Sequence, residues 1–206
     1  MKLYLKLKNA LDIIMFRLFF RNKFREFGDG SRIVNALKID GIQNISIGNK
    51  VYVAYKTWLA AVSHTGCEEC ELIIGDGTSI GNFNHIYATK SIVIGSNVLT
   101  ADKVYISDNL HSYEDVHIPI IQQGIKQIGT VTIGDGSWLG ENVCVIGANI
   151  GKNSVVGANS VVTKDIPDYC VAVGSPARII KRYCFDNNKW LITDKNGIFK
   201  IQSDKN

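Results

Sequence analysis

Hydrophobic positions recur along this chain with a period of six residues. Helices would need a period of about 3.6 residues, and half-buried strands would alternate every second residue. A six-residue unit accommodates one short strand and one bend, so three units predict a triangular coil whose anchor residues point inward. The anchors form five triplets: Ile47, Val53, Leu59; Ile74, Ile80, Ile86; Ile94, Thr100, Ile106; Ile133, Leu139, Val145; and Ile150, Val156, Val162.

The residues that follow the anchors support this interpretation. Glycine comes directly after the anchor at positions 48, 75, 81, 95, 134, 140, 151 and 157, where it permits a bend. A small or β-branched residue stands four positions after many anchors, as at Thr78, Ser137 and Ser154. The pattern predicts an all-β fold, a parallel β-helix of hexapeptide repeats whose stacked coils bury a continuous aliphatic ladder.

One stretch breaks the period. In "VYISDNLHSYEDVHIP" (residues 104–119) the anchor Ile106 is followed by Asp108 and His111, and then by a polar segment. We predict that residues 112–129 leave the coil as a loop excursion, because a short turn would serve the fold and long loops in solenoids are typically functional. The chain then divides into an N-terminal helix (1–27), a repeat domain (28–183) and a C-terminal appendage (184–206).

The positive charge is concentrated at the N-terminus. Of the 206 residues, the first 27 hold seven basic and two acidic residues, a net charge of +5 against +4 for the whole chain. The repeat domain therefore offers no basic face, and we expect no nucleic-acid partner. The segment is amphipathic but has no run of about 18 apolar residues and no small-residue cleavage site. It would either pack on the flank of the repeat domain or lie on an anionic membrane.

Five widely spaced cysteines indicate free thiols in a reducing, cytoplasmic setting. Cys67 and Cys70 have CxxC spacing, but no second pair accompanies them, so we expect a loop with two thiols. The predicted location is the cytoplasm, with a peripheral contact at the inner face of the membrane if residues 1–27 bind lipid.

A family resemblance rests on residues 138–183, "WLGENVCV…IGKNSVVGANSVVTKDIPDYCVAVGSPARIIKRY". This segment is similar to the signature of hexapeptide-repeat acyltransferases, a group with galactoside, maltose, antibiotic and O-antigen or exopolysaccharide acetyltransferases. The resemblance covers residues 38–183. It implies a left-handed coil, a homotrimer with sites at subunit interfaces, and acetyl-CoA as co-substrate without a metal.

The resemblance also assigns a role to the histidine at the break. In the family a D-x-x-H stretch at this point carries the catalytic histidine, which matches Asp108 and His111. Direct acyl transfer needs a base for the acceptor's proton, and histidine titrates in the right range. Asp108 or a backbone carbonyl would hold its tautomer. The alternative for His111 is a surface histidine in a turn.

Further site residues follow from the same resemblance. In "GNFNHIY", Asn84 and His85 would contact the acceptor, the alternative being corner residues bonded to backbone. Trp138 would lie beside the thioester, and the N–H of Glu141 would polarise the acyl carbonyl. The remaining residues expected to bind the coenzyme are Gly140 and Ala158 at the pantetheine arm, Thr163 and Lys164 at the nucleotide, and Arg178 and Lys181 at the phosphates. The family pattern is broken once, where Val145 and Ile150 are five residues apart instead of six.

The sequence thus predicts an acetyl-CoA-dependent O- or N-acetyltransferase that acts on a hydroxyl or amine of a sugar or glycan precursor. Two alternatives remain open. One is a β-helix scaffold without catalytic activity. The other is a zinc carbonic-anhydrase-like enzyme of the same fold, which would need three converging histidines; the spacing of His85, His111 and His117 does not suit that site.

Overall fold

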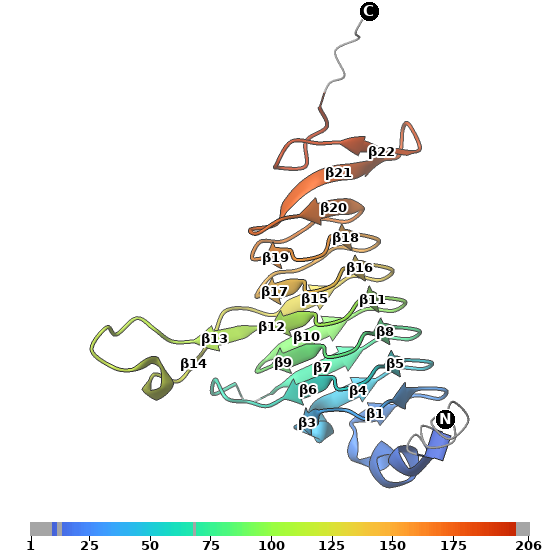
Figure 1. Cartoon of the computed structure of the whole chain (residues 1–206), viewed down its shortest axis with the longest axis vertical. Helices are drawn as coiled ribbons and strands as arrows, with labels where there is room; N and C mark the ends of the chain where they lie inside the picture. The colour runs from blue at the N-terminus through green and yellow to red at the C-terminus, as the bar shows by residue number, and fades with distance from the viewer. Residues whose placement is uncertain (1–9, 12–13, 68, 201–206) are drawn as a thin grey trace, which may run out of the picture.

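The chain folds into a stack of coils with three sides, each formed by a β-sheet (Figure 1). The computed structural model describes residues 10–11, 14–67 and 69–200. Side 1 consists of β1 (Glu26–Phe27), β4 (Ile45–Ile47), β7 (Glu71–Ile74), β10 (Ser91–Ile94) and β15 (Val131–Ile133). Side 2 consists of β2 (Arg32–Ile33), β5 (Tyr52–Val53), β8 (Ser79–Ile80), β11 (Leu99–Thr100), β16 (Trp138–Leu139), β18 (Val155–Val156) and β20 (Cys170–Val173). Side 3 consists of β3 (Lys38–Asp40), β6 (Trp58–Ala61), β9 (His85–Ala88), β12 (Tyr105–Ser107), β17 (Cys144–Ile146) and β19 (Val161–Val162).

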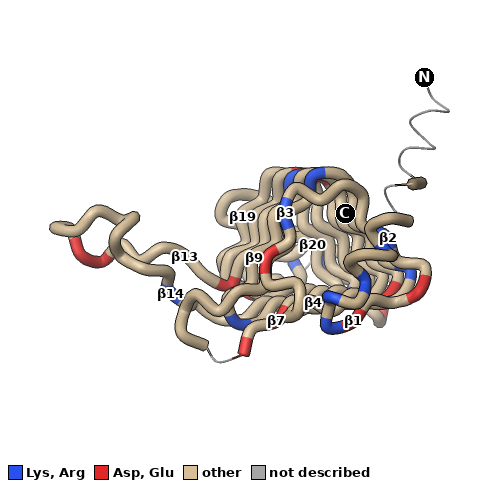
Figure 2. The backbone as a smooth tube through the Cα atoms, turned by 90° about the horizontal axis from the view of Figure 1, so that it is seen from below, with Lys and Arg blue, Asp and Glu red and all other residues tan. Residues whose placement is uncertain are grey.

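Strands on each side pair in parallel with the strands of the coils before and after. Ile47 lies opposite Ile74, which lies opposite Ile94, which in turn lies opposite Ile133. Figure 2 looks along the stack, and the successive coils lie over one another in that view. The predicted all-β architecture of stacked parallel coils is confirmed.

The core is the ladder that the period predicts. All fifteen anchors are at most 2% exposed, and the large ones, such as Leu59, Ile80 and Leu139, are fully buried. Burial of a side chain of this size stabilises the fold by about 1.5–3 kcal/mol relative to exposure. The anchor at Thr100 is also buried, and its hydroxyl donates to the Asn84 side chain over 3.0 Å.

Hydroxyl side chains connect successive coils at the bend after side 1. The hydroxyl of Ser137 donates to the carbonyl of Gly151 (2.7 Å) and accepts from the N–H of Ser154 (3.1 Å). Thr78 makes the equivalent pair of bonds two layers away. Both hydroxyls are buried and satisfied, which explains why small polar residues occupy this position.

The five-residue spacing between Val145 and Ile150 is absorbed at the corner between sides 3 and 1. β17 keeps its register with β12 and β19, so side 3 is not displaced. The missing residue shortens only the turn, where Gly147 adopts a positive φ of 57° and Ala148 is buried. This corner is distinct from the one that holds Gly140.

Short segments cover the two ends of the stack. Residues 14–20 are helical and lead into the 3-10 turn η1 (Arg21–Lys23), while η2 (Ile42–Asn44) lies between β3 and β4. The predicted helix over 1–27 falls in part outside the described residues. At the other end, β21 (Arg178–Cys184) and β22 (Lys189–Ile192) add two antiparallel strands to side 2. Among the described residues, no helix has the length and apolar character needed to span a membrane.

Candidate active site

The break in the period forms a hairpin that projects from the stack (Figure 1). Its strands are β13 (Asn109–His111) and β14 (Ile125–Gln127), which pair antiparallel with His111 opposite Ile125. We call residues 109–127 the excursion hairpin; it includes the short turn η3 (Ile120–Gln122). His111 is exposed, and the hydrogen bonds found among the described residues include none to its ring. The imidazole is therefore accessible in the single chain.

Asp108 is placed differently from our expectation. Its carboxylate is fully buried and accepts hydrogen bonds from the N–H groups of Thr89 (2.9 Å), Lys90 (2.8 Å) and Ser91 (2.9 Å). The Thr89 hydroxyl and the Asn109 amide each donate over 2.9 Å as well. These donors occupy the carboxylate, and no hydrogen bond joins it to His111 within the described chain. Asp108 thus holds the base of the excursion hairpin and not the histidine tautomer.

Gln127 completes this anchorage from the returning strand. Its amide donates to the carbonyl of Asp108 (2.9 Å), and its side-chain oxygen accepts from the hydroxyl of Thr65 (2.9 Å) and lies 2.8 Å from the hydroxyl oxygen of Thr89. We call Asp108, Thr89, Gln127 and Thr65 the polar clamp. It joins both strands of the hairpin to two neighbouring coils, so the orientation of β13 is fixed at its origin.

The tip of the excursion hairpin is ordered by local bonds but exposes apolar side chains. Glu114 and Lys126 form an ion pair, which lowers the pKa of the Glu114 carboxyl to about 2. The Gln123 amide donates to the carbonyls of Asp115 (2.8 Å) and Ile118 (2.7 Å). The exposed apolar residues of the tip are Tyr113, Val116, Ile118, Ile120 and Ile121, of which Val116 and Ile121 are 87% and 89% exposed.

Asn84 does not face an open surface. Its side chain is 1% exposed, donates to the carbonyl of Ala101 (2.8 Å) and accepts from the Thr100 hydroxyl (3.0 Å). The acceptor-binding role of Asn84 stays a prediction, and in the single chain its hydrogen-bonding groups are committed to the next coil. The alternative, a corner residue bonded to backbone, describes it.

His85 belongs to an aromatic row on the outer surface of side 3. Its ring stacks on Trp58 with centroids 4.2 Å apart and meets Tyr105 at 5.2 Å. Burial in this row lowers the pKa of His85, and its Nε2 atom is buried without a partner among the described residues. Next to this row, the Tyr87 hydroxyl and His64 Nδ1 are 2.7 Å apart.

His64 and Tyr87 were not predicted as part of a site. Asn109 donates to the carbonyl of Tyr87 over 3.2 Å, so the pair lies beside the origin of the excursion hairpin. Thr65 of the polar clamp follows His64 directly. The alternation of strand β9 could have indicated part of this site, because its two outward residues, His85 and Tyr87, are both aromatic. No sequence pattern links this strand to His64.

The residues expected at the pantetheine arm do meet. Gly140 and Ala158 occupy the corner between sides 2 and 3 on successive coils, and a Cβ atom on Gly140 would come within 2.7 Å of the Ala158 nitrogen. Coil stacking alone therefore requires glycine here. The exposed side chain of Trp138 precedes this corner. The backbone carbonyl of Glu141, the residue after Gly140, accepts a hydrogen bond from the N–H of Asn159 over 2.8 Å. The hydrogen bonds of the described residues give the Glu141 N–H no acceptor.

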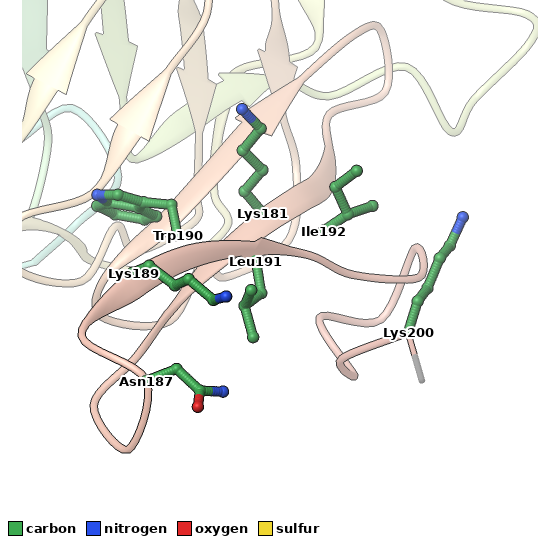
Figure 3. A pocket seen from close by; sticks show the side chains of 7 residues that line it. All are labelled: Lys181, Asn187, Lys189, Trp190, Leu191, Ile192 and Lys200. Carbon is green, nitrogen blue, oxygen red and sulfur yellow. The ribbon is translucent and has the colours of Figure 1, made fainter. Parts of the chain in front are cut away.

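The residues expected at the nucleotide lie elsewhere. Thr163 and Lys164 are exposed at the corner between sides 3 and 1, on the last complete coil. Arg178 and Lys181 are exposed on β21, after Ala177, whose N–H donates to the carbonyl of Val161 over 2.8 Å. Lys181 lines an open pocket of about 820 Å³ with Lys189, Trp190 and Lys200 of the C-terminal segment (Figure 3). This pocket is cationic and lies beyond the repeat.

The candidate residues thus form two groups in one chain. The excursion hairpin leaves from the corner between sides 3 and 1, whereas Gly140 and Ala158 lie at the corner between sides 2 and 3. On one coil, Asp102 and Asp108 mark these two corners, and strand β12 of side 3 runs between them. A histidine on the hairpin and an acyl group at Gly140 of the same chain are therefore kept apart.

Neither a metal cluster nor a disulfide is found in the described part of the chain. No group of three or more His, Cys, Asp or Glu side chains is arranged to hold an ion there. All five cysteines are free. Cys70 is buried, and burial raises the pKa of its thiol to about 12, so it stays protonated near neutral pH.

The fold and the repeat define the class to which this chain is similar. Residues 130–164 match a family described as the hexapeptide repeat of succinyl-transferase. The chain is 38% identical over 68% of its length to a protein of Mycobacterium tuberculosis named "Probable acetyltransferase Rv3034c". It is 42% identical over 48% of its length to galactoside O-acetyltransferase of Escherichia coli K12. The matches cover 45% and 49% of these relatives, less than half of each.

Solved structures show the same fold. A mutant of AntD, an N-acyltransferase from Bacillus cereus in complex with dTDP and coenzyme A, aligns with a TM-score of 0.67 at 20% identity, over 81% of this chain and 88% of that chain. A maltose O-acetyltransferase from Clostridium difficile aligns with a TM-score of 0.51 at 29% identity, over 79% of this chain and 71% of that chain. The chain shares with them the architecture of stacked parallel coils. Its resemblance to hexapeptide-repeat acyltransferases, predicted from residues 138–183, is confirmed.

Proposed function

We propose that this protein is an acetyl-CoA-dependent acetyltransferase that acts on a hydroxyl or amine of a sugar or glycan precursor. His111 is the general base that takes the acceptor's proton as the acceptor attacks the thioester carbonyl. The new ester or amide forms as the carbon–sulfur bond breaks, and coenzyme A leaves as the thiol. No protein nucleophile is needed for direct transfer, and a general base of this kind contributes about 10²–10⁴-fold to the rate.

The observation that carries this proposal is the placement of His111. The longest interruption of the coil among the described residues is held at its origin by the polar clamp, and it presents an exposed imidazole without a structural partner. A scaffold would gain nothing from burying five hydrogen bonds to Asp108 in order to hold an exposed histidine. The resemblance to acetyltransferases supports the same role.

The coenzyme is proposed to lie along the corner between sides 2 and 3. The pantetheine arm would pass this corner, where Gly140 has no side chain and Ala158 only a methyl group, and the N–H of Glu141 would donate to the acyl carbonyl as negative charge develops there. Trp138 borders the thioester. Arg178 and Lys181 would bind the phosphates, for which charge-assisted hydrogen bonds are well suited, and Thr163 and Lys164 flank the nucleotide.

We further propose that a homotrimer completes the site. Within one chain the hairpin and the Gly140 corner lie on opposite edges of side 3, so a second copy is needed to bring them together. The exposed apolar residues at the hairpin tip, including Val116 and Ile121, are the surface expected to contact that copy. A left-handed sense of the coil belongs to this proposal and rests on the family resemblance. The free thiols favour the cytoplasm as its location.

The test is acetyl-CoA turnover by the wild type and by His111→Ala, measured as free thiol with a panel of sugars and nucleotide sugars. We expect the variant to lose at least about a hundredfold in kcat while it still binds coenzyme A. Because His111 is exposed, the substitution should leave the melting temperature unchanged. Wild-type protein that does not bind the coenzyme would favour a scaffold. A variant that keeps full turnover would remove His111 from the mechanism.

A further inference from the structure

The helix over residues 14–20 lies at the N-terminal end of the stack (Figure 1), and several of its large apolar side chains are exposed. Leu18 and Phe19 are 71% and 62% exposed, and the neighbouring Leu11, Ile14 and Met15 are also exposed. With about 100° between successive residues of the helix over 14–20, Ile14, Met15, Leu18 and Phe19 form a stripe about 140° wide. Exposure of so many large apolar side chains on one element is unusual for a surface that meets only water.

The opposite side of the same helix is already in use. Phe16 stacks on Phe20 with centroids 5.2 Å apart and contacts Phe24 and Phe27 at 6.2 and 6.4 Å. Phe24 and Phe27 belong to the buried core. The helix is therefore held by its aromatic side, and its orientation keeps the exposed stripe directed outward.

The stripe continues into a groove between the helix and the first coil. This groove has a volume of about 670 Å³, and the apolar residues of its walls include Met15, Phe19, Phe20, Ile33, Ala36 and Ile39. Leu37, next to the groove wall, is 60% exposed. Helix and coil together thus offer one continuous apolar surface at this end of the molecule.

Basic side chains border this surface. Arg17 and Arg21 extend from the helix toward Asp29, at 3.9 and 3.1 Å, and Lys23 lies 4.8 Å above the Phe20 ring. One carboxylate does not neutralise these cations, and the first 27 residues carry a net charge of +5. Two copies that paired through this face would bring their positive segments together, which opposes self-association.

We propose that this face docks on an anionic lipid bilayer. The apolar stripe would enter the boundary between headgroups and acyl chains, while Arg17, Arg21 and Lys23 meet the lipid phosphates. The docking surface lies at the end of the stack opposite the C-terminus (Figure 1) and does not depend on the chemistry at His111.

Co-sedimentation of the full chain with vesicles tests this assignment. We expect binding to vesicles of equal parts phosphatidylcholine and phosphatidylglycerol, and little binding to phosphatidylcholine alone. The Leu18→Ser/Phe19→Ser variant should partition at least about tenfold less, because two apolar side chains no longer enter the bilayer. Lys23→Gln should reduce binding about fivefold at low salt.

A matched control removes two apolar side chains elsewhere. Ile192 and Ile198 are 61% and 66% exposed on the C-terminal segment, and Ile192→Ser/Ile198→Ser should bind vesicles like the wild type. All variants replace exposed side chains and should keep the wild-type melting temperature. The proposal is overturned by wild-type protein that does not sediment with anionic vesicles, by equal binding to both vesicle types, or by equal losses in the two double variants. A smaller lipid-free assembly of Leu18→Ser/Phe19→Ser, together with no vesicle binding, would assign the face to a second copy.

Discussion

The coil stack and the excursion hairpin achieve order by different means. In the stack, every layer repeats the same arrangement, and an anchor such as Ile106 is fixed by the layers above and below it. In the hairpin, residues 112–124 have no neighbouring layer, and the polar clamp at Asp108 sets the direction of both strands. The stack tolerates no change of register, whereas the hairpin depends on a few side-chain contacts at its origin.

This difference shows where chemistry can be placed in a solenoid. The inward positions of the stack are occupied by buried aliphatic residues, and its corners by residues that satisfy the next coil, as Asn84 does. A reactive side chain that must meet a substrate has to stand where the repeat stops. His111 stands at that point, and this is why the period itself led to the candidate site.

Deletion of a buried anchor should have the largest effect. Ile106→Ala is expected to lower the free energy of unfolding by about 2–5 kcal/mol, since Ile106 is fully buried between two layers. Ile121→Ala in the hairpin tip makes the same chemical change at an 89% exposed residue and should stay within about 0.5 kcal/mol. Urea denaturation measures both. Similar losses in the two variants would contradict the distinction between stack and hairpin.

Asp108→Asn should weaken the hairpin more than the stack. The amide cannot accept all five hydrogen bonds, so a buried N–H at Thr89, Lys90 or Ser91 loses its partner at a cost of about 1–3 kcal/mol. We expect kcat to fall while the KM for the coenzyme is kept, because His111 is no longer held in place.

The matched control for this variant is Asp76→Asn. Asp76 accepts the N–H of Asn49 at a solvent-exposed corner of the stack, and this hydrogen bond lowers the pKa of its carboxyl. That variant should keep kcat. A wild-type kcat in Asp108→Asn as well would show that the clamp does not position the histidine.

The sequence predicted the stack because its information is local. Each anchor recurs at a fixed interval, and the serines and threonines of the bends occupy a fixed position after it, so one period describes coils throughout the chain. The excursion was predicted as the place where that interval fails. The residues that hold the excursion hairpin in place follow no period, and several of their hydrogen-bond partners lie in other parts of the chain.

The polar clamp, the aromatic row and the buried position of Asn84 could not be predicted from the sequence and were found only in the structure. Thr65, Thr89 and Gln127 are brought together from three separate segments of the chain. Trp58, His85 and Tyr105 are 27 and 20 residues apart, so they align only once the unequal coil lengths are known. Asn84 matches a family motif, but whether its side chain faces inward depends on the next coil.

His85 provides a pH-dependent comparison on the stack side. Burial lowers its pKa from 6.5, so folding favours the neutral ring. Its contribution to stability is therefore present above the unfolded pKa of about 6.5 and is lost as the pH falls through the lower folded value. His85→Phe should flatten this part of the stability profile. A ring that titrates at or above 6.5 by NMR would contradict the assignment.

Glu114 provides the corresponding comparison in the hairpin, with the smallest expected effect. Its pKa of about 2 results from the ion pair with Lys126 and not from burial. Above the ordinary pKa of 4.5, the ion pair with the Glu114 carboxylate contributes to the stability of the fold. That contribution is lost as the pH falls toward 2 and the carboxylate takes up a proton. Lys126→Gln and high salt should both return the NMR titration midpoint of Glu114 toward 4.5, whereas salt should hardly move that of His85. No change in the midpoint would show that the ion pair does not hold the carboxyl.

The most direct test of the account is whether two defective copies restore each other. His111→Ala removes the proposed base at one corner, and Ala158→Trp blocks the proposed path of the coenzyme arm at the other. Each variant alone should be inactive. If neighbouring copies share a site, mixed assemblies formed from equal amounts should recover about a quarter of the wild-type turnover of acetyl-CoA, because random mixing pairs an intact histidine with an intact corner at that frequency. Mixed assemblies that remain as inactive as the single variants would contradict a site built from two copies of this chain.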